Sequence, residues 1–178
     1  IIGSPYTSET PKVGIIGDDV SGNRVTSSKF ATLSAGAIAS TIYNNKLYIV
    51  GTNIITIIPL TGAENKTQLA ISDYPQDIAF YSLNKAYIPH GNSVAVKDPT
   101  DLTTALLADI DLPSGNGLSP DTGYSTNSSP SCVDVVNGLV FVGLSNLGSD
   151  YMPHGPGLLT VISPTSDTVE KVITLNYR

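Results

Sequence analysis

The sequence contains no tryptophan, and it has only one methionine and one cysteine among 178 residues. Charged residues make up 13% of the chain, well below the ~25% of an average globular protein. No apolar run approaches the ~20 residues that a membrane-spanning helix needs, so we expect no membrane span.

The lone Cys132 excludes an internal disulfide. Because no histidine lies near it in the sequence to act as a base, we expect a buried structural thiol rather than a nucleophile.

Basic residues are also scarce. The chain has 9 Lys and Arg residues and 15 Asp and Glu residues, which gives a net charge of −6. An acidic surface repels phosphate backbones, so we expect no nucleic-acid partner. The chain begins with Ile1 rather than Met, which favours a processed or truncated product. Low charge together with many Ser, Thr and Asn residues favours an extracellular, periplasmic or cell-surface location.

Turn-forming and β-branched residues are abundant. There are 16 Gly and 12 Pro residues, and they separate short runs rich in Ile, Val, Thr and Tyr. Three segments, 37–72, 76–112 and 131–175, align as internal repeats. The alignment gives three sets of equivalent positions, which are Tyr48/Tyr87/Phe141, Ile57/Val96/Val161 and Thr61/Thr100/Thr165.

The repeat has a period of about 40 residues and no helical pattern, which is typical of four-stranded β-propeller blades. Each segment divides into four runs of strand length, and in the third segment these are 131–136, 139–144, 158–163 and 169–175. Two-residue links predict tight hairpins between the first and second runs, at Asn44-Asn45, Leu83-Asn84 and Asn137-Gly138. We therefore predict an all-β chain of propeller blades, each made of four antiparallel strands.

The blades are expected at about 35–73, 74–113 and 128–176, after a partial blade at 1–34. In the partial blade, 1–4 is expected as the end of a second strand, 12–18 as a third and 24–33 as a fourth. A propeller closes into a ring, and about three and a half blades are too few for the common rings. The whole of 1–178 is therefore expected to be one segment of a ring of about six to eight blades, with the other blades supplied by another chain segment.

The second run of each repeat reads KLYIVGTN (46–53), KAYIPHGN (85–92) and LVFVGLSN (139–146). The third run and its turn read SVAVKDPTDLTT (93–104) and GLLTVISPTSDTVEKVITL (157–175). These segments resemble the YVTN family of propeller repeats, which occurs in YncE-like and surface-layer proteins. The family's usual Asp after the third strand is kept at Asp98 but replaced by Ser163 and Pro59. The resemblance implies the propeller fold, but it does not choose a function, because relatives include binding proteins and lactonase-like enzymes.

Strands alternate in direction within a blade, so the links between strands 2 and 3 and the links from strand 4 to the next blade emerge at the same end. Both long insertions, 113–130 and 145–157, fall in such links. Long loops in a compact fold are commonly functional, and Tyr is favoured at interfaces. We therefore predict that this end binds a protein or a small-molecule ligand, with Tyr124, Asp150, Tyr151, His154 and His90 as the candidate binding residues.

Both histidines lie in Pro-His-Gly triplets at matched positions, His90 and His154, and Asp150 is close to the second. These three residues are weak candidates for a metal site, because imidazole and carboxylate suit Zn²⁺. A hydrogen-bonding or pH-sensitive loop histidine and a plain turn residue are the alternatives. Asp77 and Asp134, on the expected inner strands, leave a similar choice between ion binding and a capping role.

The sequence contains no nucleophile elbow, zinc-protease motif, phosphate-binding loop or dinucleotide fingerprint. We therefore assign no catalytic residue and expect no cofactor, with a metal ion as the exception left open. The first hypothesis is a non-catalytic, exported or surface-associated propeller that acts as a binding module through the long-loop end. The alternative is a lactonase-like or metal- or quinone-dependent enzyme with its site in the propeller funnel, so enzymatic activity stays undecided.

Overall fold

The computed structural model describes residues 2–3, 12–13, 16–18, 24–26, 31–32, 36–60, 66–105, 108–113, 128–147, 152 and 156–175. Side chains are described from residue 36 onward, with 103–105 excepted. Every regular element in these ranges is a β-strand. In the described ranges there is accordingly no helix long and apolar enough to cross a membrane. The chain divides into two compact units, Ile1–Ile71 and Ser72–Arg178, each described by itself below.

The first unit contains one complete four-stranded antiparallel sheet, in the order β6-β7-β8-β9. Its strands are β6 (Ala37–Tyr43), β7 (Lys46–Gly51), β8 (Ile54–Pro59) and β9 (Thr67–Ala70). Five short strands precede it: β1 (Ile2–Gly3), β2 (Lys12–Val13), β3 (Ile16–Asp18), β4 (Arg24–Thr26) and β5 (Ala31–Thr32). They pair as β1-β2-β5 and as β3-β4, so the third and fourth strands expected at 12–18 and 24–33 are each divided in two.

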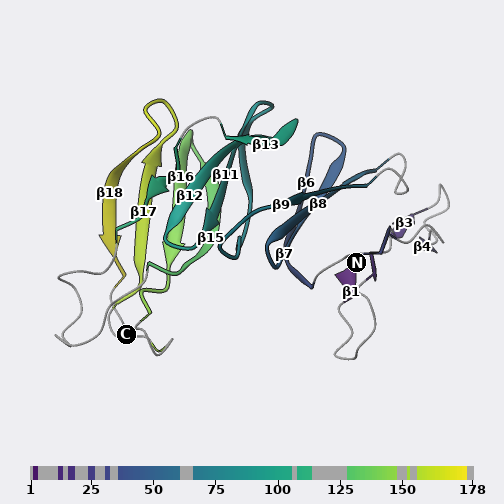
Figure 1. Cartoon of the computed structure of the whole chain (residues 1–178), viewed down its shortest axis with the longest axis horizontal. Coiled ribbons are helices and arrows are strands. Elements are labelled where there is room, and N and C mark those ends of the chain that lie inside the picture. The colour runs from purple at the N-terminus through teal and green to yellow at the C-terminus, as the bar shows by residue number, and fades with distance from the viewer. Residues whose placement is uncertain are drawn as a thin grey trace. The chain divides into compact units, whose positions relative to one another are not determined.

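The second unit contains two sheets, which Figure 1 shows in teal and in green to yellow. The first is β10 (Ala79–Ser82), β11 (Lys85–His90), β12 (Ser93–Asp98) and β13 (Asp101–Ala105), with β14 (Ile110–Asp111) also paired to β12. The second is β15 (Pro130–Val136), β16 (Leu139–Leu144), β17 (Leu158–Ser163) and β18 (Thr168–Thr174). The strands of this last sheet begin and end within one residue of the predicted runs.

The strand pairing confirms the alignment of the repeats. Tyr48 lies opposite Ile57, Tyr87 opposite Val96, and Phe141 opposite Val161. One aromatic residue on the second strand thus faces one β-branched residue on the third in every blade. Cross-strand pairs of this kind stabilise a sheet by roughly 0.2–1 kcal/mol each. The prediction of four-stranded antiparallel blades is therefore confirmed.

The predicted two-residue hairpins are present, but they use two different backbone geometries. Asn44 and Asn45 have φ angles of 45° and 57°, and Asn137 has 51°. Asn tolerates this left-handed conformation better than other side chains do. Leu83 and Asn84 turn without a left-handed residue, and the Ser82 hydroxyl donates to Asn84 Oδ1 at 2.7 Å. The first and third turns therefore depend on the residue type at φ > 0, whereas the second depends on a side-chain hydrogen bond.

The core of the second unit lies between its two sheets. Tyr87, Val94 and Val96 of the β10–β14 sheet pack in one buried cluster with residues of the β15–β18 sheet, which are Val133, Val140, Val142, Leu144, Leu158 and Ile162. All of these side chains are less than a tenth exposed. Burying an aliphatic or aromatic side chain of this size stabilises a fold by about 1.5–3 kcal/mol. The central part of one face of each sheet is thus covered by the other.

Strand alternation also decides the position of Cys132. Val133 points into the core between the sheets, so its neighbour Cys132 lies on the opposite face of β15. The thiol is exposed there. The expectation of a buried structural thiol was therefore wrong, because one residue along a strand reverses the face.

Asp77 joins the two sheets of the second unit at their inner strands. Its carboxylate accepts hydrogen bonds from the backbone N–H of Ile78 at 2.9 Å and from that of Val133 at 3.0 Å. Val133 is in β15, so the bond connects the start of one blade to the first strand of the next. Of the two roles open for Asp77, the structure therefore shows the capping of backbone donors.

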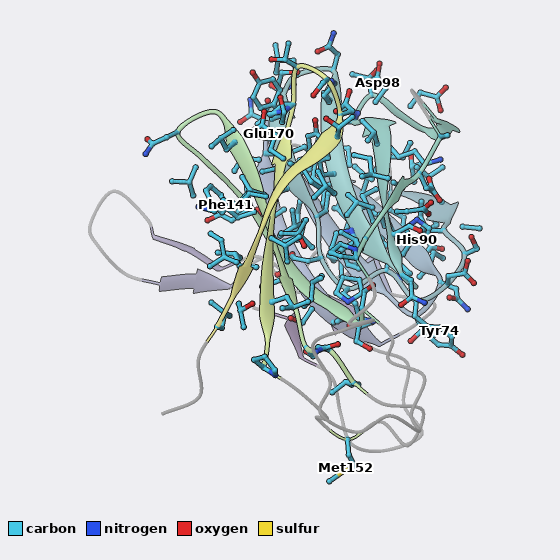
Figure 2. All side chains as sticks on the ribbon, turned by 90° about the vertical axis from the view of Figure 1, so that its left-hand side faces the viewer. Tyr74, His90, Asp98, Phe141, Met152 and Glu170 are labelled. Atoms are coloured by element: carbon cyan, nitrogen blue, oxygen red, sulfur yellow. The ribbon has the colours of Figure 1, made fainter. Side chains whose placement is uncertain are left out.

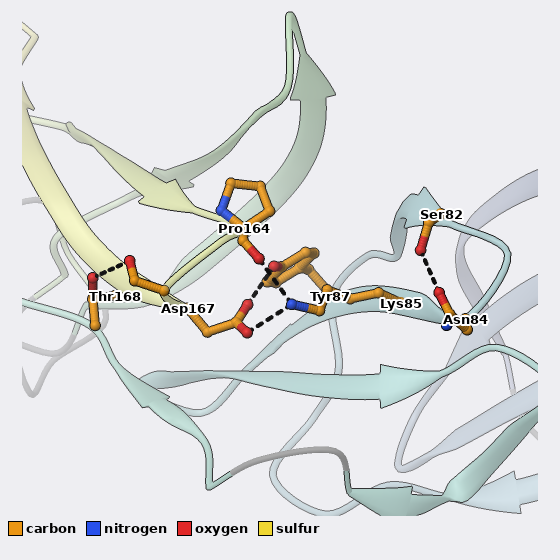
Figure 3. Close-up of polar contacts among 8 residues, drawn as sticks. Ser82, Asn84, Lys85, Tyr87, Pro164, Asp167 and Thr168 are labelled. Atoms are coloured by element: carbon orange, nitrogen blue, oxygen red, sulfur yellow. Dashed lines mark hydrogen bonds and ion pairs between the residues drawn. The ribbon is translucent and has the colours of Figure 1, made fainter.

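A polar cluster joins the same two sheets at the end with the short turns (Figure 3). Lys85 Nζ lies 2.7 Å from Asp167 Oδ2 and donates to the Pro164 carbonyl at 2.8 Å. The Tyr87 hydroxyl donates to the other oxygen of Asp167. Burial raises the pKa of Tyr87 well above its usual 10.0, and the hydrogen bond to Asp167 raises this pKa further. A short turn of one blade is thereby fixed to the second strand of its neighbour.

The Tyr87→Phe variant should be about 1 kcal/mol less stable than the wild type at pH 7, because it loses this hydrogen bond. In the wild type the unfolded state loses the phenolic proton first, from about pH 10. The folded state then binds more protons, so wild-type stability falls as pH rises, by about 1.4 kcal/mol per pH unit. The Tyr87→Phe variant has no phenol at this position, so its free energy of unfolding does not fall for this reason. The difference in free energy of unfolding between the wild type and the variant should therefore shrink between about pH 9 and 11.

Urea unfolding at several pH values between about 9 and 11 measures the effect. The matched control is Tyr81→Phe, which removes the hydroxyl of a tyrosine that is 41% exposed, and it should cost little at pH 7. A Tyr87→Phe difference that stays constant with pH would contradict the assigned environment of Tyr87.

Candidate functional site

In the second unit, the links that were predicted to share one end do lie together. Tyr74 belongs to the link before β10, and Met152 belongs to the link between β16 and β17. Figure 2 shows both at the lower end of the molecule, whereas Asp98, in the turn between β12 and β13, lies at the upper end. We call the lower end of this unit the long-loop end.

A cleft of about 610 Å³ opens at the long-loop end. Its walls come from four links: the one before β10, the β11–β12 turn, the one before β15, and the one after β16. The residues that line it are Asp73, Tyr74, Gln76, Gly91, Asn92, Ser129, Pro130, Ser131, Ser145 and Leu147. A volume of this size is in the ~300–1,000 Å³ range of small-molecule sites.

The first wall is built by consecutive left-handed residues, Asp73 with φ 60° and Tyr74 with φ 54°. Such a backbone conformation costs of order 1–3 kcal/mol per residue outside glycine and persists only where surrounding contacts hold it. Here the Gly91 N–H donates to the Asp73 carbonyl at 2.6 Å, and the Gln76 N–H donates to the Pro89 carbonyl at 3.0 Å. The Gln76 side chain donates to the Tyr74 carbonyl at 3.0 Å. The β11–β12 hairpin therefore fixes the strained link.

The second wall is centred on the buried Ser128. Its N–H donates to Asn92 Oδ1 at 3.0 Å, and its hydroxyl donates to the Leu112 and Pro113 carbonyls at 3.3 and 3.2 Å. Its neighbour Ser129 has φ 44° and accepts a bond from the Ser145 N–H at 3.0 Å. Both sheets of the unit thus contribute to a hydrogen-bonded rim around the cleft.

Most of the predicted binding residues cannot be placed in this site. Tyr124, Asp150, Tyr151 and His154 lie outside the described residues. Their neighbours Ser129, Ser145 and Leu147, from the same two insertions, do line the cleft. The long-loop end is thus where the cleft is found, while the roles of those four side chains remain predictions.

His90 is the one predicted binding residue that the structure describes. It is the last residue of β11 and is buried, and it is not among the residues that line the cleft. Its Nε2 lies 3.1 Å from Asp109 Oδ2, but no described group makes a hydrogen bond with either of its ring nitrogens. Across the described ranges, no three His, Cys, Asp or Glu side chains gather as they would to hold a metal ion.

Sequence reasoning missed Asp73, Tyr74 and Gln76. It weighted the two long insertions, whereas these residues occupy the short link at 72–78. A signal was present, because every link from strand 4 to the next blade opens at the same end, whatever its length. The Asp-Tyr-Pro sequence at 73–75 also marks a turn that projects side chains.

The three antiparallel sheets of about four strands, two of which share a core in the second unit, make this chain a β-propeller segment. Among solved structures, it is similar to the N-terminal domain of Nup159 at a TM-score of 0.56 and 13% identity, covering 95% of this chain and 46% of that one. It is also similar to PorZ, a bacterial surface component of the type-IX secretion system of Porphyromonas gingivalis, at 0.54 and 14%, covering 88% of this chain and 20% of PorZ.

A third similar chain belongs to the complex of Saccharomyces cerevisiae Dbp5 with Nup159, Gle1, IP6 and ADP, with a TM-score of 0.51 and 14% identity, covering 80% of this chain and 38% of that one. This chain therefore spans less than half the length of each of these three structures. No protein-family model and no curated protein matches the sequence. The resemblance to YVTN repeats stays a prediction.

The Gly91→Ala variant tests the construction of the cleft wall. Gly91 has φ +49°, and a Cβ added there would lie 3.2 Å from Asp73 Cβ. The left-handed conformation alone costs an alanine about 1 kcal/mol. Displacing Asp73 adds to this cost, so urea unfolding should show a loss of more than about 1 kcal/mol.

The matched control for this variant is Gly138→Ala, because Gly138 has φ +78° and open space around an added Cβ. It should show the conformational cost alone. Equal losses for the two variants would mean that the link at Asp73 yields freely and is not held against the β11–β12 turn.

Proposed function

We propose that this chain is a non-catalytic binding module that holds a ligand in the cleft at its long-loop end. The observation that supports this most is the cleft itself, which four links from two blades enclose. Three of its lining residues, Asp73, Tyr74 and Ser129, keep left-handed backbones without being glycine. Strain of this kind is commonly found at ligand-binding sites.

Chemical-shift mapping on the ¹⁵N-labelled chain tests the proposal without a known ligand. The probes are a panel of neutral oligosaccharides and a panel of tetrapeptides, each added singly. At least one probe should perturb amide signals at 73–76, 91–92, 129–131 and 145–147, while signals at 98–101 and 164–167, at the opposite end, stay unchanged. If no probe of either panel shifts the cleft signals, or if both ends respond alike, the cleft is not the binding site.

We further propose that the outer face of the β15–β18 sheet is covered by another propeller blade. Phe141 and Val161 form the cross-strand pair of this face, and they are equivalent to Tyr87 and Val96 of the preceding sheet. Tyr87 and Val96 are buried beneath the β15–β18 sheet. Figure 2 shows Phe141 on the side that faces the viewer, away from that core.

The composition of this outer face indicates the chemistry of its partner. In the preceding sheet, Lys85 and Tyr87 form the cluster with Asp167. The equivalent positions of the β15–β18 sheet are occupied by Leu139 and Phe141. A blade packed here needs no acidic turn at this point. It should instead present aliphatic residues, as Val140, Val142 and Ile162 do on the covered face.

Cys132 reports whether this face is covered, because it is the only cysteine, is exposed, and lies on the same face as Phe141. In the protein isolated from its natural source, the thiol should be protected from Ellman's reagent. The isolated 178-residue chain should react at the rate of an exposed cysteine. Equal, fast reaction in both preparations would contradict the proposal that a further blade covers the sheet.

A further inference from the structure

Most of the residues that line the cleft have polar side chains, and almost none of them is charged. Gln76, Asn92, Ser129, Ser131 and Ser145 are neutral and polar, and no Lys, Arg or His is among the described residues that line it. Among the described lining residues, Asp73 is the one carboxylic acid. An anionic ligand would meet no cation among these residues, and the chain as a whole carries a net charge of −6. The lining therefore favours a neutral ligand.

The lining contains two amide side chains, Asn92 and Gln76. Each is held in place by a hydrogen bond at one of its two polar atoms, and the other polar atom is left for a ligand. Asn92 uses its Oδ1 to accept from the Ser128 N–H, and no described residue accepts from its Nδ2. Gln76 uses its Nε2 to donate to the Tyr74 carbonyl, which leaves its Oε1 as an acceptor. The cleft thus presents a fixed donor and a fixed acceptor before any ligand binds. Fixing these groups in advance lowers the entropic cost of binding.

Hydroxyl groups match such a lining, because each one can donate and accept at once. The Ser131 hydroxyl, which donates to the Gly143 carbonyl at 3.3 Å, keeps its lone pairs for a further donor. The Asp73 carboxylate adds acceptors of the kind that bind paired hydroxyls. A ligand with several neighbouring hydroxyls would satisfy these groups together.

Tyr74 supplies a broad apolar surface next to these polar groups. Its side chain is 60% exposed, and its backbone is fixed in the strained link described above. The C–H face of a sugar ring stacks on an aromatic ring of this kind. A peptide would need pockets for its side chains, and only Pro130 and Leu147 are aliphatic in the lining.

We infer that the cleft binds a neutral saccharide, which stacks on Tyr74 and is held through its hydroxyls by Asp73, Gln76 and Asn92. This inference rests on the proposed binding function of the cleft. The same donors and acceptors could contact a peptide backbone, and the experiment below separates the two classes of ligand.

The Tyr74→Trp variant turns the cleft into its own reporter, because the chain has no other tryptophan. Its fluorescence is titrated with maltotetraose, cellotetraose, mannotetraose and tetra-N-acetylchitotetraose, with the acidic tetragalacturonate, and with the same panel of tetrapeptides. At least one neutral saccharide should produce a saturable change in emission, and tetragalacturonate should produce none. The control Tyr81→Trp, on a partly exposed tyrosine of β10 outside the cleft lining, should not respond.

A second variant tests the hydrogen bonding without disturbing the wall. Asn92→Asp, made in the Tyr74→Trp background, keeps an oxygen that accepts from Ser128 and replaces the Nδ2 donor by a charged acceptor oxygen. It should weaken saccharide binding about fivefold, as expected for one lost hydrogen bond. Asn84→Asp is the matched control, because it makes the same change at the opposite end and keeps the oxygen that accepts from Ser82.

The outcomes separate this inference from the proposed function. If tetrapeptides change the emission and saccharides do not, the cleft is a binding site but the ligand class assigned here is wrong. If tetragalacturonate binds as well as the neutral sugars, the charge argument is wrong. If neither panel changes the emission and neither shifts the cleft amides, both the inference and the proposed function are overturned. Unchanged saccharide affinity in the Asn92→Asp variant would contradict the inference that Asn92 Nδ2 donates a hydrogen bond to the ligand.

Discussion

The second unit depends on the packing of one sheet face against another. Tyr87, Val94 and Val96 on one side and Val140, Val142 and Ile162 on the other are buried only because the two sheets stack. Neither sheet could bury these side chains alone, since a four-stranded sheet has two faces and no interior. Stacking also brings the inner strands close enough for Asp77 to accept the Val133 N–H, and the short turns close enough for Asp167 to meet Lys85 and Tyr87.

The cleft is a consequence of this stacking. Once the apolar faces are in contact, the alternation of strand direction gathers the links before β10 and β15 with the β11–β12 and β16–β17 links. The links then hydrogen-bond to one another, as Ser128 does to Asn92 and Leu112. The opposite end has short turns, and there the same geometry yields the cluster around Asp167 (Figure 3). Hydrogen bonds between the blades are therefore present at both ends of the unit, and the cleft opens at the end where the longer links emerge.

The fold could be predicted from sequence because it is encoded in local signals that repeat. Spacing placed Tyr48, Tyr87 and Phe141 at one position, and the strand pairing confirms it. Local signals failed where a contact between distant residues decides the outcome. Cys132 was expected to be buried and is exposed on the outer face, and the cleft wall at Asp73 and Gln76 is formed by hydrogen bonds to Gly91 and Pro89 in the next hairpin. The exported or surface location stays a prediction.

The sequence alone predicted the order of the four main strands in each complete blade, the pairs that face each other across them, and the end at which the longer links emerge, but not the additional strand β14 beside β12. It could do so because strand period, turn residues and repeat spacing act over a few residues. Only the tertiary structure decided which face of β15 is covered, where His90 is buried, and which side chains enclose a cleft. Those features depend on how two sheets approach each other, which is set by the fit of side chains that are more than fifty residues apart, such as Asp77 and Val133.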